Sequence, residues 1–177
     1  MKVGLFFGSF DPPHAGHIDL VTSALNAKVV DWIMVIPAWQ NVWKSNSSKY
    51  ELRLVMCQRA FQSLAVVSDV ESKIDNKGST YDVIKYLQNQ YTSYGLDKVV
   101  EFVMLTTCET WKEIPKWENG DKLLTEIPII VEGIDFHASG IPIHSTNVRD
   151  MIKQGKLPQP AISHEIYNLI RSNKLYT

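Results

Sequence analysis

Two histidines, His14 and His17, follow the first apolar run of the chain and have the side chains needed to bind phosphate. The apolar run covers residues 3–7, and an amphipathic stretch begins at His17. This order predicts a strand, a turn and a helix. Where a parallel strand gives way to a helix, backbone N–H groups and the helix dipole attract anions. The two imidazoles therefore predict a phosphate-binding pocket at this point of the chain.

The turn between the strand and the helix has residues suited to a close backbone approach. Gly8 permits a sharp turn and lets a ligand come near. Asp11 precedes two prolines, which stiffen the turn. We expect Gly8, Ser9 and Phe10 to form a backbone cradle for phosphate, with Gly16 against the same group.

A second polar cluster, His144 to Arg149, follows the last apolar run and opens another amphipathic helix. Ser145 or Thr146 is predicted to cap that helix. Arg149 is expected in the first turn, where the helix dipole disfavours a cation by about 0.3–1 kcal/mol unless an anion is bound nearby. We therefore expect Arg149, together with Ser145 and Thr146, to hold phosphate. His144 has two interpretations, a phosphate contact or simple exposure.

Short β-rich runs must position these clusters. They are expected at residues 3–7, 32–36, 65–70, 99–105 and 127–131, and helical patterns separate them. Two such patterns cover residues 51–64 and 81–91, and Ser79 with Asp82 predicts a helix start. This alternation favours an α/β fold with a doubly wound, mostly parallel sheet and helices on both faces.

Composition narrows the class of protein. A chain of 177 residues fits one domain, 1–177, and its formal net charge of −1 offers no general attraction to nucleic acid or anionic membranes. Cys57 and Cys108 match neither a zinc spacing nor a disulfide framework, which favours a reducing compartment. The apolar runs are too short for a signal peptide or a membrane span. We expect a soluble cytoplasmic protein without nucleic-acid or membrane partners; its oligomeric state stays open, a homo-oligomer included.

The first cluster resembles the H-x-G-H signature of the nucleotidyltransferase superfamily, and Ser145, Thr146 and Arg149 resemble its S-T-x-x-R element. The resemblance implies a Rossmann-like fold and transfer of a nucleotidyl group from a nucleoside triphosphate without a covalent enzyme intermediate. Mg²⁺ would accompany ATP as the cofactor, and no separate set of protein metal ligands is predicted. Catalysis would consist of positioning and neutralising charge on the phosphoryl oxygens. The resemblance implies that His14, His17 and Arg149 are catalytic. It also implies that ATP is bound by the residues Gly8, Ser9, Phe10, Gly16, Ser145 and Thr146.

Within that superfamily the chain looks most like the nicotinate or nicotinamide mononucleotide adenylyltransferases, which join a pyridine mononucleotide to the AMP part of ATP. The resemblance implies that Lys44, at the end of a loop after the second strand, assists phosphate binding. Thr80 would lie near the carboxylate or amide of the base, and Trp117 would stack on the pyridine ring. Glu109 would contact substrate from the segment that precedes this tryptophan.

The chain also departs from the family pattern. Thr107, Cys108 and Glu109 stand where the family has Gly-Ala-Asp, which removes a glycine and lengthens the carboxylate by one methylene. Val42 and Trp43 replace the usual Pro-His of the lysine loop. The chain is therefore interpreted as a divergent member, and both nicotinate mononucleotide (NaMN) and nicotinamide mononucleotide (NMN) remain open as acceptors.

Two alternatives remain beside this interpretation. The opening of the chain also resembles phosphopantetheine adenylyltransferase, although His14, Thr80 and Trp117 favour the pyridine enzyme. The other alternative is a non-catalytic nucleotide-binding module that lost turnover through its altered 107–109 segment. The presence of His14, His17 and Arg149 together favours an enzyme over a binding module.

Overall fold

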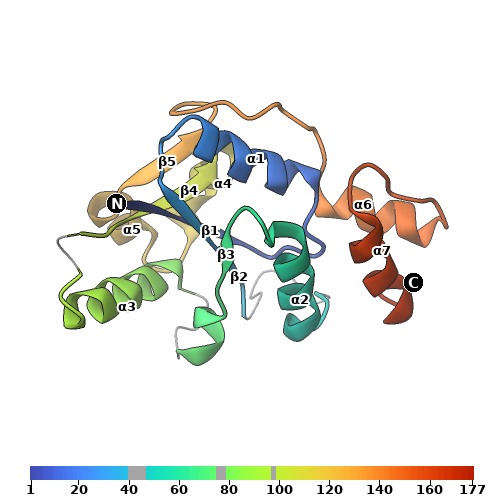
Figure 1. Ribbon diagram of the computed structural model, residues 1–177, viewed down its shortest axis with the longest axis horizontal. Helices are drawn as coiled ribbons and strands as arrows, with labels where there is room; N and C mark the ends of the chain where they lie inside the picture. The colour runs from blue at the N-terminus through green and yellow to red at the C-terminus, as the bar shows by residue number, and fades with distance from the viewer. Residues whose placement is uncertain (40–46, 75–78, 97–98) are drawn as a thin grey trace.

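Five parallel strands form one sheet in the order β3-β2-β1-β4-β5, with β1 at its centre (Figure 1). The computed structural model describes residues 1–39, 47–74, 79–96 and 99–177. The strands are β1 (Lys2–Gly8), β2 (Trp32–Pro37), β3 (Val66–Val67), β4 (Glu101–Thr107) and β5 (Ile129–Glu132). The predicted doubly wound parallel sheet is confirmed.

The strand order places a topological switch point beside β1. The chain first builds outward from β1 through β2 to β3, and then crosses to the other side of β1 to form β4 and β5. In open α/β sheets, ligands bind at the carboxyl ends of the strands where the order reverses. This rule directs attention to the carboxyl ends of β1 and β4, where the first histidine cluster follows β1.

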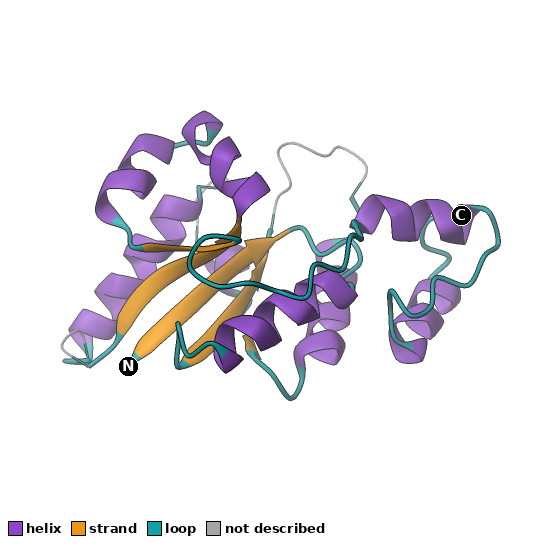
Figure 2. Cartoon of the chain, turned by 90° about the horizontal axis from the view of Figure 1, so that it is seen from above, coloured by secondary structure: helices purple, strands orange, loops and turns teal. Residues whose placement is uncertain are grey.

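Helices cover both faces of the sheet, as predicted, and Figure 2 shows them on either side of the strands. On one face, α1 (Ala15–Asn26) and α2 (Tyr50–Phe61) bury apolar side chains against the sheet. On the other, α3 (Thr80–Ser93) and α5 (Gly120–Glu126) do the same. The central strands are buried on both sides, which explains why β1 reads as a continuous apolar run instead of an alternating one.

The last two helices, α6 (Ser145–Lys153) and α7 (His164–Ser172), lie beside the sheet and not over it (Figure 1). Their apolar side chains form a third cluster with Met56 of α2. Three shorter helices connect the larger elements: η1 (Val70–Lys73), α4 (Cys108–Glu113) and η2 (Ile114–Lys116). Packing on α2 fixes α6, and with it the second polar cluster.

Several predicted boundaries differ from the structure. The strand expected at 65–70 contains only Val66–Val67, because Val70 instead begins η1 and is buried in the core of the opposite face. The strand expected at 99–105 begins two residues later, since the N–H groups of residues 99 and 100 donate to the Leu96 carbonyl in a turn. The strand expected at 127–131 begins after Pro128, which has no N–H, and Ile127 is instead the C-cap residue of α5.

None of the helices in the described part of the chain combines the length and apolar character needed to cross a bilayer. The assignment of residues 1–177 to one domain stays a prediction.

Candidate active site

A cleft of about 430 Å³ opens where β1, β4 and β5 end. Four of the predicted site residues line it together: His14, Gly16, His17 and Glu109. Its other walls include the last residues of β4 and β5 and the stretch 138–144, which leads into α6. The cleft lies at the switch point that the strand order indicates.

The imidazole rings of His14 and His17 are stacked in this cleft, with ring centroids 3.7 Å apart and planes inclined by 29°. The backbone N–H of His14 donates to Nδ1 of His17 at 3.2 Å. Since Nδ1 accepts, a neutral His17 ring carries its proton on Nε2. The Phe10 ring packs edge-on against His17, with centroids 4.9 Å apart, and holds the imidazole in this orientation.

His14 is a buried histidine that lacks a hydrogen-bond partner on one side. Only 5 % of it is exposed, and its Nδ1 atom has no partner among the described residues. Burial, with a smaller contribution from the charge of His144, lowers the pKa of His14 to about 4. At neutral pH the ring is therefore uncharged and acts through hydrogen bonding. Because buried polar groups are normally satisfied, this atom points to a ligand.

Two glycines permit the close packing around these rings. A Cβ on Gly16 would lie 3.2 Å from the His14 ring and 3.4 Å from the Ile141 carbonyl oxygen. A Cβ on Gly8 would lie 3.0 Å from the Phe10 ring. Phe10 thus occupies the space over Gly8. Gly8, Ser9 and Phe10 are not among the residues that line the cleft, and their role as a cradle for ATP stays a prediction.

The second polar cluster contacts the turn of the first one directly. Arg149 donates through Nη1 to the Asp11 carbonyl at 2.7 Å and through Nη2 to Oγ1 of Thr146 at 3.0 Å. The Ser145 hydroxyl donates to the Pro12 carbonyl at 2.9 Å. Helix α6 is thereby joined to the turn before His14. These three side chains border the turn without lining the cleft.

The start of α6 corrects two expectations. The helix begins after His144, which is extended (φ −118, ψ 152) and donates its N–H to Oδ1 of Asn147 at 3.1 Å. His144, and not Ser145 or Thr146, is therefore the N-cap. Arg149 consequently lies beyond the first turn, and the dipole argument for an anion beside it does not hold. His144 itself lines the cleft and is exposed there.

The residues expected around the pyridine ring gather at a different place. Ser79 caps α3 by accepting from the Asp82 N–H at 3.3 Å, which confirms the predicted helix start, and Thr80 is the first helical residue. Trp117 follows η2 and packs half-buried against the core under α3 and α5. Asn119 donates from Nδ2 to Ser79 Oγ at 3.4 Å, which links the two segments.

Lys44 lies outside the described residues, as do Val42 and Trp43. The chain on both sides of that segment is anchored. The Trp39 N–H donates to Oε2 of Glu71 at 2.7 Å, and the Ser48 N–H donates to Oδ2 of Asp11 at 3.1 Å.

Arg53 is a supporting residue that the sequence analysis missed. It is 2 % exposed, and its guanidinium donates to three carbonyls: Ser9 at 2.8 Å, Ala38 at 2.7 Å and Ser48 at 3.0 Å. It thus ties the turns after β1 and β2 together. A signal was present in the sequence, because this arginine falls on the buried stripe of α2, three and four residues before two buried side chains.

Glu71 was missed as well. It is 4 % exposed in η1, and burial raises its pKa to about 7 although the Trp39 N–H and the Arg53 charge act in the opposite direction. It holds the chain at the exit from β2.

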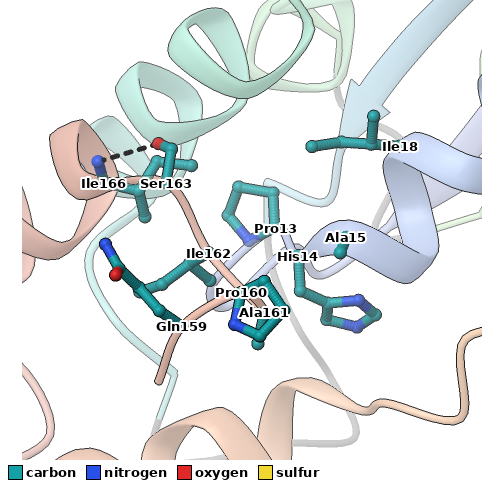
Figure 3. A pocket seen from close by; sticks show the side chains of 10 residues that line it. All are labelled: Pro13, His14, Ala15, Ile18, Gln159, Pro160, Ala161, Ile162, Ser163 and Ile166. Carbon is teal, nitrogen blue, oxygen red and sulfur yellow. Dashed lines mark hydrogen bonds between the residues drawn. The ribbon is translucent and has the colours of Figure 1, made fainter. Parts of the chain in front are cut away.

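A second hollow, of about 380 Å³, lies between the start of α1 and residues 159–163 (Figure 3). Figure 3 shows Pro160 and Ala161 beside His14. The Ala161 carbonyl accepts the N–H of Ala15 at 2.7 Å. The first N–H of α1 is thus satisfied within the chain and is not available to phosphate. Because this hollow is mostly apolar, the charged chemistry belongs to the larger cleft.

Comparisons with known proteins agree with this geometry. Residues 5–151 match the family described as Cytidylyltransferase-like. A relative from Sulfurovum sp., named "Probable nicotinate-nucleotide adenylyltransferase", is 30% identical over 84% of this chain and 84% of its own. One of the same name from Nitratiruptor sp. is 27% identical over 97% of this chain and 100% of its own.

A solved structure with the same fold is that of Plasmodium falciparum nicotinic acid mononucleotide adenylyltransferase complexed with NaAD. It has a TM-score of 0.79 and 18% identity, covering 99% of this chain and 97% of that one. The chain belongs to the cytidylyltransferase-like family, in the group of the nicotinate-nucleotide adenylyltransferases.

Proposed function

We propose that this protein transfers the adenylyl group of ATP to a pyridine mononucleotide, with NaMN preferred to NMN, and releases pyrophosphate. The observation that carries the proposal is the stacked histidine pair in the cleft, in which the Nδ1 of buried, uncharged His14 has no hydrogen-bond partner among the residues that the structure describes. The names of the relatives and the NaAD complex of a structure with the same fold support the choice of acceptor.

In the proposed reaction, an oxygen of the acceptor's phosphate attacks the α-phosphorus of ATP. A new P–O bond forms while the bond from the α-phosphorus to the oxygen bridging to the β-phosphorus breaks. The electron pair of that bond leaves with pyrophosphate, and the product is the dinucleotide. The attacking phosphate is already ionised near neutral pH, so no side chain has to remove a proton. The protein's task is to align the reactants and stabilise charge.

The cleft provides groups for that task. Nε2–H of His17 and the uncharged ring of His14 would donate to the α-phosphoryl oxygens, where charge grows in the transition state. Gly16 lets the nucleotide approach these rings. Arg149 has a rigid fork of five N–H donors, of which two are used by Asp11 and Thr146. We propose that its remaining donors contact the triphosphate.

The acceptor would extend toward the α3 side of the sheet. We propose that Trp117 stacks on the pyridine ring and that Thr80 lies near the ring's carboxylate, while Lys44 neutralises phosphate. Glu109, which lines the cleft with the histidines and not with Trp117, would accept hydrogen bonds from nucleotide hydroxyls.

Mg²⁺ would enter with ATP. The described residues contain no group of three or more His, Cys, Asp or Glu side chains able to hold a metal ion. This fits Mg²⁺, which usually keeps several waters and binds through substrate phosphates instead of a protein cage. When bound, it supplies charge neutralisation on the triphosphate. Both cysteines are free, which supports our proposal of a reducing, cytoplasmic location.

The test is an acceptor panel. The purified protein is incubated with Mg-ATP and, separately, NaMN, NMN or 4′-phosphopantetheine, while pyrophosphate release and the adenylylated product are measured. We expect fastest release with NaMN, slower release with NMN and none with phosphopantetheine. If pyrophosphate were released only with 4′-phosphopantetheine, the proposed pyridine mononucleotide acceptor would be wrong. Calorimetric binding of ATP without release from any acceptor would indicate a binding module.

A further inference from the structure

Asp11 is a buried carboxylate in the turn that leads to the histidine pair. It is 4 % exposed, and each of its carboxylate oxygens accepts one hydrogen bond. Oδ1 accepts from the Tyr176 hydroxyl at 2.6 Å, and Oδ2 accepts from the Ser48 N–H at 3.1 Å. A hydrogen bond to an ionised acceptor at this length is among the stronger ones in proteins.

Tyr176 reaches this carboxylate from beyond α7. The chain turns after that helix through hydrogen bonds from the Lys174 N–H to the Arg171 carbonyl (3.2 Å) and from the Leu175 N–H to the Ile170 carbonyl (3.0 Å). The Tyr176 ring packs against the cluster of α2, α6 and α7. Burial raises the pKa of its hydroxyl, and the Asp11 charge raises that pKa further. The hydroxyl therefore stays protonated and remains a donor at any working pH.

The main chain at Asp11 and Pro12 is held by side chains of α6. Its carbonyl accepts from Arg149, and the next carbonyl, of Pro12, accepts from Ser145. Two residues of the turn are thus fixed through the side chain by Tyr176 and through the backbone by α6. His14 follows three positions after Asp11 and is the N-cap residue of α1.

We propose that Tyr176 is a positioning residue for adenylyl transfer, holding the Asp11 carboxylate so that the turn presents His14 and Arg149 to the triphosphate in the reactive geometry. Tyr176 itself does not touch substrate. The inference rests on the proposed function, since the reaction that it serves is the one proposed above.

The test is Tyr176→Phe, which removes the hydroxyl and keeps the ring in its cluster. We expect kcat with Mg-ATP and NaMN to fall about tenfold, because small misalignments of reacting groups cost that much or more. We expect KM for NaMN to change less than about twofold, and affinity for a non-hydrolysable ATP analogue to fall about threefold. Tyr167→Phe is the matched control, because Tyr167 lies on α7 and packs against the same cluster. It should leave all three quantities unchanged.

A double-mutant cycle separates positioning from general stability. If Tyr176 acts through the turn that Arg149 holds, the effects of Tyr176→Phe and Arg149→Lys on kcat should be non-additive. Asp11→Asn, whose single carbonyl oxygen cannot serve both donors, should lower kcat as Tyr176→Phe does. It provides the same test should Tyr176→Phe not fold, which thermal melting would reveal.

The outcomes separate this inference from the proposed function. An active wild type with unchanged kcat and analogue affinity in Tyr176→Phe would overturn the positioning role. Additive effects in the cycle, or equal losses in Tyr167→Phe, would overturn it as well. A wild type that turns over no pyridine mononucleotide would overturn the proposed function alone, since analogue binding by the two variants would still decide whether Tyr176 orders the nucleotide site.

Discussion

The imidazole of His14 lies stacked on that of His17, with ring centroids 3.7 Å apart, and the first residue gives its backbone N–H to Nδ1 of the second. One short segment thus sets the tautomer of one ring and the position of both. Because burial keeps His14 uncharged, the pair would present hydrogen-bond donors to the proposed phosphate without the repulsion of two adjacent cations.

His17→Ala should lower kcat on the order of 10²–10³-fold, as expected when a donor to a developing oxyanion is lost. Its melting temperature should change little, because the ring is only half-buried. Steady-state kinetics with Mg-ATP and NaMN provide the measurement. His164→Ala, at the exposed start of α7, is the control. Wild-type turnover in His17→Ala would remove the catalytic assignment.

Trp117→Ala should raise KM for the pyridine mononucleotide about tenfold and leave KM for ATP unchanged, because a stacked aromatic ring contributes on the order of 1 kcal/mol to binding. Both constants are measured by varying one substrate at saturation of the other. Trp32→Ala, at the opposite end of the strands and 57% exposed, should change neither. An equal rise in both constants would exclude the stacking role.

His14 should make folding stability depend on pH. Its pKa is about 4 in the folded protein and 6.5 ordinarily, so between these values the unfolded chain binds more protons. Stability therefore rises with pH across this window and is lost as pH falls through it, by at most about 3 kcal/mol. Urea unfolding at pH 7.5, 6 and 5 should show a smaller loss in His14→Gln than in the wild type. Identical pH dependence in the two proteins would contradict this assignment.

Glu71 should make folding stability fall as pH rises, which is the opposite of the effect of His14. Its folded pKa of about 7 exceeds the ordinary 4.5, so the folded state favours the protonated form, and this contribution is lost as pH rises through 7. Glu71→Gln stays neutral and can still accept from the Trp39 N–H. We expect it to be about 1–3 kcal/mol more stable than the wild type at pH 8 and nearly equal at pH 4.5. The control is Glu118→Gln at an exposed position, whose stability relative to the wild type should not change with pH. If the stability difference between Glu71→Gln and the wild type were the same at pH 8 and pH 4.5, the raised pKa of Glu71 would be refuted.

Local sequence determined much of the fold and the phosphate motif. The alternation of β-rich and amphipathic runs predicted the parallel sheet and its two helix layers. This was possible because the spacing of apolar residues within a short window indicates a strand or a helix. The Ser79 cap was predicted for the same reason. The ends of the elements followed less closely from the sequence. The β-branched run before Val70 predicted a strand up to that residue, but Val70 begins η1 and is buried in the core on the α3 and α5 face of the sheet.

The tertiary structure alone decided what holds the site. No local pattern in the sequence pairs Asp11 with Tyr176, which lies 165 residues away. Nor does any local pattern show that Arg149 donates a hydrogen bond to the Asp11 carbonyl. The carbonyls that Arg53 joins likewise come from two separate connections, Ser9 after β1 and Ala38 and Ser48 between β2 and α2. Such contacts depend on how the layers dock, and burial then makes each polar group's partner obligatory. The sequence by itself therefore determined which chemistry is present, and the packing of distant segments decided its geometry.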